Sequence, residues 1–250
     1  MRYFIELAYN GKDFNGWQRQ PNAPSVQQTL EEALSTLMRT PIDVVGAGRT
    51  DTGVHAQKMF AHFDWDTKIE DCEQLCYQLN QFLPNTIAIR SIRLVIDSAH
   101  ARFDALQRTY EYHISFEKDP FDAHGSYKFG AALDLDRMHM ACDVLMKHRD
   151  FECFSKSKTD VKTYICEITA AHWKPTERGL VFTISANRFL RNMVRAIVGT
   201  LLEIGQGKKT VEQLEAIIAS KNRSEAGYSV PAQGLYLTDI TYPQKIFVDG

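Results

Sequence analysis

The sequence lacks several features that would place it in a specialised class of protein. No run of about 18 apolar residues occurs, so we expect no membrane-spanning segment and no membrane partner. The first residues, MRYFIELAYNG, lack the basic start and continuous apolar core of a secretory signal, so we expect a cytoplasmic protein. The five cysteines are odd in number and include no C-x-x-C pair, which argues against a disulfide framework and a zinc knuckle.

A strong charge of one sign is also missing. The formal net charge is −2 at pH 7, whereas a domain that binds nucleic acid usually carries a basic excess. The balance weighs mildly against a nucleic-acid partner, unless the positive charge is concentrated on one face. With 44% hydrophobic and 24% charged residues, the 250 residues have an ordinary globular composition, long enough for one large domain or two small ones.

Strict alternation of apolar and polar residues predicts several strands. Tyr3, Ile5 and Leu7 share one face near the start, and the same pattern recurs at residues 58–65, 109–116 and 180–186. Such alternation is typical of antiparallel strands with one buried face.

Capping signals and helical periodicity predict five helices. Ser25 and Gln28 have the spacing of a capping box before an apolar stripe, and Thr210 and Gln213 repeat that spacing near the end of the chain. The other three helices are expected at residues 71–82, 135–148 and 188–205.

The order of these elements predicts the architecture. The first half reads β-α-β-β-α-β-β and the second β-α-β-β-α-α-β, which indicates two related α+β units, each a sheet with helices on one face. The polar residues 115–126 are the expected connector, and the two sheets are expected to join into one extended sheet.

The segment GAGRTDTGVHA, residues 46–56, has two interpretations. In one, its glycines permit a tight turn that an ion pair between Arg49 and Asp51 stabilises. In the other, the loop lies between two strand-like segments, at a sheet end where functional sites collect. The neighbouring guanidinium then keeps the Asp51 carboxylate ionised, and an ionised carboxylate can act as a nucleophile or a general base.

The helix expected at 188–205 carries three arginines. Arg188, Arg191 and Arg195 are three and four residues apart, so we expect them on one helix face. Alone, such a stripe is typical of a solvated edge. Arg195 is flanked by apolar residues, however, and a buried guanidinium requires a carboxylate partner, for which Asp51 is a candidate.

Tyr110 also has two interpretations. A tyrosine at the start of a strand usually packs in the core or at its rim. Together with Arg102 and Arg108, it could instead bracket a nucleobase and its phosphate.

The motif GRTDTGVHA resembles the signature loop of the tRNA pseudouridine synthase A family. Five other segments resemble that family in the same order, which is far more specific than one short motif. They are residues 9–34, 83–92, 99–112, 187–207 and 231–242.

The resemblance implies an isomerase that converts uridine to pseudouridine at positions 38, 39 and 40 in the anticodon stem-loop of tRNA. It implies a homodimer that uses no metal and no organic cofactor. The implied fold is α+β with two ferredoxin-like halves, whose mixed or antiparallel sheets form one extended sheet. Residues 1–116 are expected to carry the catalytic Asp loop, and residues 117–250 the Arg helix.

The resemblance also implies roles for particular residues. Asp51 corresponds to the catalytic nucleophile and Arg195 to its ion-pair partner, while Tyr110 corresponds to an active-site tyrosine that stacks on the uracil and is available for proton transfer. Arg49 is associated with moving the target base out of the stem. The expected substrate contacts are Tyr110, Arg49, Arg102, Arg188 and Arg191. Whether the carboxylate attacks the sugar or the uracil stays open.

Two rival functions stay open as well. A non-catalytic RNA-binding protein would use the same surface without chemistry. An aspartate-dependent hydrolase would use a metal held by acidic and histidine side chains, but their spacing matches no metal motif. The side chains in question are Asp51, His55, Asp64 and Asp66.

Overall fold

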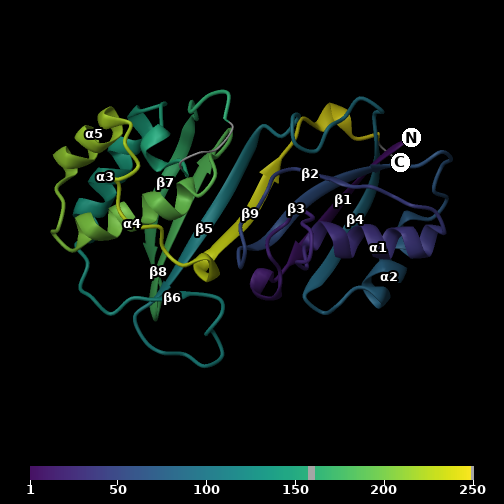
Figure 1. Cartoon of the computed structure of the whole chain (residues 1–250), viewed down its shortest axis with the longest axis horizontal. Helices are drawn as coiled ribbons and strands as arrows, with labels where there is room; N and C mark the ends of the chain where they lie inside the picture. Colours follow the sequence, from purple (N-terminus) through teal and green to yellow (C-terminus); the bar gives the residue numbers. More distant parts are fainter. Residues whose placement is uncertain (157–160, 249–250) are drawn as a thin grey trace. The chain divides into compact units, whose positions relative to one another are not determined.

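The computed structural model describes residues 1–156 and 161–248, which form two compact units. Unit 1 comprises Met1–Gln107 and Tyr236–Gly250, and unit 2 comprises Arg108–Leu235. Both units contain helices and a sheet, so the predicted α+β class is confirmed (Figure 1). The order of helices and strands along each half also confirms the predicted order.

In unit 1 the strands follow the order β4-β1-β3-β9, with β2 paired to β3. All the pairs are antiparallel except β3 with β9, which is parallel. Helices α1 and α2 pack beside each other, and α2 packs on β4 (Figure 1). The elements are β1 (Arg2–Tyr9), a 3-10 turn (Gly11–Asp13), α1 (Val26–Met38), β2 (Val45–Gly46), β3 (His55–Asp64), α2 (Cys72–Phe82), β4 (Ile87–Val95), β9 (Leu235–Thr241) and a 3-10 turn (Gln244–Ile246).

In unit 2 the strands follow the order β5-β8-β7 and are antiparallel, while β6 pairs parallel to β5. Helix α3 packs on β7 and against α4 and α5 (Figure 1). The elements are β5 (Gln107–Ser115), β6 (Tyr127–Lys128), α3 (Leu135–Lys147), β7 (Ile168–Pro175), β8 (Gly179–Ala186), α4 (Met193–Gly205) and α5 (Val211–Ser220), with 3-10 turns at Glu152–Phe154 and Ala232–Gly234. Both sheets are therefore mixed. The joining of the two sheets concerns the relative placement of the units and stays a prediction.

The division into units differs from the predicted domains 1–116 and 117–250. Strand β5 pairs with β8, so it belongs to unit 2. Strand β9 pairs with β3, so the end of the chain returns to unit 1. Residues 115–126, the predicted connector, consequently lie within unit 2.

Two helix starts confirm their capping signals. The Ser25 side chain accepts the Gln28 N–H at 3.3 Å. At α5, Thr210 and Gln213 form the complete reciprocal capping box. Each cap satisfies backbone donors that the first helical turn leaves without a partner.

Helix α4 begins later than predicted, at Met193 instead of residue 188. The residue before it, Asn192, has φ of 68°, a left-handed conformation that interrupts a right-handed helix. Arg188 and Arg191 therefore precede the helix, and the predicted stripe of three arginines on one helix face is wrong. Arg195 lies in the first turn of α4 and is half-buried, whereas the expected helix at 188–205 would have placed it well inside the helix.

Strand β3 is buried on both faces, whereas its alternation predicted one. Five consecutive residues, Met59–Phe63, are buried. The additional cover comes from the end of the chain, where the rings of Tyr242 and Phe247 lie 5.2 and 6.0 Å from that of Phe4. The Tyr242 ring is also 5.1 Å from that of Phe60. Such aromatic packing between residues far apart in the chain leaves no mark in local periodicity.

No helix in the two described ranges is long and apolar enough to cross a bilayer. All five cysteines are free, as their spacing predicted.

Candidate active site

The loop between β2 and β3 carries Asp51, and backbone contacts hold it in place. Its partner is the segment 11–17, which we call the brace. The Trp17 N–H donates to the Thr50 carbonyl at 3.2 Å, and the Gly53 N–H donates to a carbonyl of the brace at 3.3 Å. Asp51 itself is half-buried. Its position along the loop is therefore set by main-chain groups on either side of it.

Glycine makes this close approach feasible. Gly16 has φ of 88°, and a Cβ built on it would overlap the carbonyl oxygen of Thr50. A Cβ on Gly11 would likewise overlap the carbonyl oxygen of Val54. Brace and loop thus touch backbone to backbone, an arrangement that a larger residue would push apart. By contrast, a Cβ on Gly48 would meet no atom within 4 Å.

Buried polar side chains reinforce the same loop. The Tyr9 hydroxyl lies 2.8 Å from the Thr50 hydroxyl, and the His55 Nδ1 accepts the Gly11 N–H at 3.1 Å. The His55 ring also stacks on Tyr236, with centroids 4.6 Å apart. These contacts account for His55 as a structural residue of the loop.

The hypothetical metal ligands of a hydrolase are not gathered together. Asp64 forms a two-pronged ion pair with Arg2, with both N–O distances at 2.8 Å. In the described part of the chain, no group of three His, Cys, Asp or Glu side chains is arranged to hold a metal ion.

In unit 2, Tyr110 and Tyr112 on β5 have different surroundings. Tyr112 is buried and its hydroxyl donates to the Pro231 carbonyl at 2.8 Å, while burial raises its pKa well above the usual range. Tyr110 is half-buried and meets the edge of Phe189, with ring centroids 5.2 Å apart. Tyr112 is thus a packing residue, and Tyr110 is the one of the two that retains solvent exposure.

Arg195 is held against the segment 223–231, which we call the strap. Its Nε donates to the Val230 carbonyl at 2.7 Å, and the Val230 N–H donates back to the Arg195 carbonyl at 3.2 Å. This reciprocal pair sets the direction in which the guanidinium leaves α4.

Two side chains hold the strap: Asn192 links it to the start of α4, and Arg223, which belongs to the strap, links residues of the strap to one another. Asn192 donates to the Ser229 hydroxyl at 2.6 Å, and Arg223 donates to the same hydroxyl at 2.9 Å. Arg223 also donates to the Gly227 carbonyl at 3.0 Å. We did not predict these positioning residues. The available signal was Gly199, an unfavourable residue within an apolar helix, which here admits the close approach of the strap.

The other predicted substrate contacts lie near the surface. Arg49 and Arg102 are exposed in unit 1, while Arg191 is exposed and Arg188 half-buried in unit 2. Asp51 and Arg195 belong to different units, so their ion pair stays a prediction.

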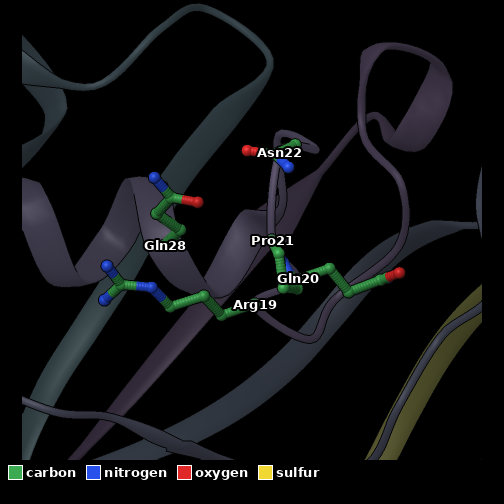
Figure 2. Close-up of a pocket in the computed structure, with 5 residues that line it drawn as sticks. All are labelled: Arg19, Gln20, Pro21, Asn22 and Gln28. Atoms are coloured by element: carbon green, nitrogen blue, oxygen red, sulfur yellow. The ribbon is translucent and has the colours of Figure 1, made fainter.

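Two hollows lie elsewhere. The larger, about 350 Å³, is lined by four residues that follow the brace, three of them polar, and by one residue of α1 (Figure 2). Those residues are Arg19, Gln20, Pro21, Asn22 and Gln28. The other, about 120 Å³, lies in unit 2 between β5, β8 and the loop after β5. Neither of these two hollows contains a predicted site residue.

Comparison with known proteins decides the family. The model of the tRNA pseudouridine synthase family matches residues 7–104 and 141–243. This chain belongs to that family. The matched ranges contain Asp51 and Arg195, while Tyr110 lies between them.

Relatives of the tRNA pseudouridine synthase family are similar over nearly the whole length. The protein of Parabacteroides distasonis is 54% identical over 246 residues, which is 98% of each chain. That of Porphyromonas gingivalis is 52% identical over 99% of each chain, and that of Bacillus subtilis is 39% identical over 97% of this chain and 99% of its own. All three are named tRNA pseudouridine synthase A. Membership of this family makes the chain an isomerase and confirms the resemblance seen in the sequence.

Proposed function

We propose that this chain isomerises uridine to pseudouridine at positions 38, 39 and 40 in the anticodon stem-loop of tRNA. Family membership and full-length similarity to proteins named tRNA pseudouridine synthase A support the reaction. Positions 38, 39 and 40 are inferred from the resemblance of the sequence motifs to those of the family. The observation that carries the proposal is the Asp51 loop, which lies within the family match and is braced on both sides by backbone contacts.

Asp51 is the proposed nucleophile. The reaction breaks the bond between N1 of the uracil and C1′ of the ribose, rotates the base, and joins C5 to C1′ as the C5 proton leaves. A carboxylate adds to C1′ or to the uracil ring and is released at the end, so the enzyme is regenerated. Arg195 would keep the carboxylate ionised, and its contact with the strap supports a defined direction of approach.

The target uridine must leave the helix stack before this chemistry. Base eversion costs a few kcal/mol, which contacts to the everted nucleotide offset. Arg49, exposed on the catalytic loop, would occupy the gap in the stem, and Tyr110 would stack on the uracil. Arg102, Arg188 and Arg191 would contact the surrounding phosphates. A closed site excludes water, which would otherwise release free uracil.

The enzyme is further proposed to act as a cytoplasmic homodimer. No metal or organic cofactor is assigned to it, because the isomerisation transfers no electrons to or from the substrate and the carboxylate supplies the nucleophile.

Incubation with unmodified tRNA, followed by chemical labelling that maps pseudouridine, tests the proposal. We expect product at positions 38, 39 and 40, and an unchanged rate in EDTA. Product confined to other positions would contradict the anticodon assignment. Tight binding without product would favour the non-catalytic RNA-binding protein, and loss of the reaction in EDTA would favour a metal-dependent mechanism.

A further inference from the structure

The loop after β4 presents a large aromatic ring to solvent. Phe103 is 74% exposed, far more than the nearby rings of unit 1. A single exposed apolar side chain is common on protein surfaces and by itself indicates nothing. What distinguishes Phe103 is the construction of the loop beneath it.

Hydrogen bonds hold the backbone of this loop at nearly every residue. The buried His62 accepts the Ala101 N–H at Nδ1 (3.1 Å), and the Tyr242 hydroxyl donates to the Ala101 carbonyl at 2.5 Å. His100 and Asp104 bond to each other twice: the His100 N–H donates to the Asp104 carboxylate at 2.7 Å, and the Asp104 N–H donates to the His100 carbonyl at 3.0 Å. The His100 ring accepts the Arg102 N–H at 3.1 Å. The exposed ring therefore stands on a rigid base.

The rings form a column that runs from the core to the surface. His62, only 4% exposed, lies 4.7 Å from His100, whose ring is 4.2 Å from that of Phe103. The Arg102 guanidinium lies 5.6 Å from the Phe103 centroid. Burial lowers the pKa of His62 to about 4 and also lowers the pKa of His100, which keeps both Nδ1 atoms available as acceptors at neutral pH.

We propose that Phe103 is a stacking platform for an unpaired nucleobase of tRNA, with Arg102 contacting the adjoining phosphate. This inference rests on the proposed function, but it concerns a site separate from the uracil contact assigned to Tyr110. A flat ring beside a guanidinium matches the combination of a base face and a negative phosphate that single-stranded RNA offers. A rigid platform also loses little conformational entropy on binding.

A second copy of the chain is a weaker explanation for the exposed ring. A stable protein interface buries roughly 800 Å² on each partner, with an apolar centre. Besides Phe103 the loop exposes two large apolar side chains, Leu106 (59% exposed) near Phe103 in the sequence and Ile96 (41% exposed) at the start of the loop, and Phe103 directly follows a charged arginine. This patch suits one base better than a protein surface.

Equilibrium binding of unmodified tRNA tests the platform, in an Asp51→Asn background that prevents turnover. We expect Phe103→Ala to raise Kd between about fivefold and a hundredfold, the range found when one base loses an aromatic partner. Phe103→Tyr should bind like the parent because it retains the ring, whereas Phe103→Leu should bind as weakly as Phe103→Ala. The matched control is Tyr77→Ala, which removes a 60%-exposed ring from α2 and should leave Kd unchanged.

Abasic nucleotides identify the stacked base. At one unpaired position, an abasic substitution should weaken binding to the parent but not to Phe103→Ala, because both changes remove the same contact. Equal Kd for parent and Phe103→Ala would overturn the inference while leaving the proposed function intact. Normal binding by Phe103→Leu, or a change of oligomeric mass in Phe103→Ala, would instead indicate apolar docking or a second copy. A parent that does not bind tRNA would overturn both this inference and the proposed function.

Discussion

The two units hold their proposed catalytic residues by different means. In unit 1, main-chain hydrogen bonds and glycine contacts with the brace position the Asp51 loop. In unit 2, side chains position Arg195, because Arg223 and Asn192 hold the strap that its Nε contacts. The backbone contacts of the brace require glycine, because a side chain there would keep the two segments apart. The contacts of the strap require particular hydrogen-bonding side chains.

This difference predicts where each unit is sensitive to substitution. The brace should tolerate changes of exposed side chains but not the addition of a methyl group at its close contacts. The strap should be weakened by the loss of one hydrogen-bonding side chain. The substitutions below probe that contrast from the largest expected effect to the smallest, and a change of pH then probes it without a substitution.

Gly16→Ala should have the largest effect on stability. The new Cβ would overlap the Thr50 carbonyl, in a residue whose φ of 88° already disfavours a side chain. We expect a loss of about 3 kcal/mol or more in the free energy of unfolding, measured by urea denaturation. Gly48→Ala is the matched control in the same region, and its stability should change by less than about 0.5 kcal/mol. Equal stability of the two variants would refute backbone positioning of the loop.

Arg223→Met should have an intermediate effect. It removes hydrogen bonds to Ser229 and Gly227, so we expect a loss of about 1–2 kcal/mol in stability. Because the strap orients Arg195, kcat should also fall on the order of tenfold, with little change in KM.

The control for Arg223→Met is Arg178→Met, which removes the same charge from an exposed ion pair with Asp119 in unit 2. Such pairs contribute roughly 0–1 kcal/mol, and kcat should stay at the parent value. A fall in kcat of the same size in both variants would show that charge, and not the strap, is responsible.

Acid should lower the stability of unit 1 more than that of the strap. The folded pKa of His62, about 4, lies below its ordinary value of 6.5 because burial disfavours the charged form. Between these pH values the unfolded chain binds a proton that the folded chain does not. The free energy of unfolding is therefore at its full value above pH 6.5 and falls by at most about 1.4 kcal/mol per unit as pH drops toward 4.

Amide hydrogen exchange can locate this acid effect. From pH 6.5 to 4.5, after correction for intrinsic rates, protection at Ala101 should fall because its acceptor is His62. Protection at Gly227, whose acceptor is the Thr200 hydroxyl, should fall less. His62→Asn, which keeps an acceptor without the titration, should remove the difference. An equal loss of protection at the Ala101 and Gly227 amides in the parent would contradict the predicted difference between unit 1 and the strap.

The fold was predictable where the signals are local. The caps of α1 and α5 and the alternating strands depend on residues a few positions apart, and the structure confirms the element order. The late start of α4 was not predictable, because an asparagine with positive φ has no fixed sequence signature. The double burial of β3 was missed for another reason: Tyr242 reaches Phe60 of β3 from the far end of the chain.

The candidate site was likewise predictable only in part. Asp51 stood out because its motif is short, glycine-rich and chemically unusual. The brace was recognisable only as part of the family resemblance, and the strap was not recognised at all. Arg223 and Ser229 act through hydrogen bonds that form after the chain folds, so no spacing rule connects them to Arg195.

The most direct test of the account is tritium release from tRNA labelled at C5 of uridine, comparing the parent with Asp51→Asn. Exchange of the carboxylate for a nearly isosteric amide removes the nucleophile and should abolish release. The variant should still bind tRNA with the parent affinity and unfold at the parent urea midpoint. Substantial residual release from the folded, tRNA-bound variant would contradict the proposal that Asp51 performs the chemistry.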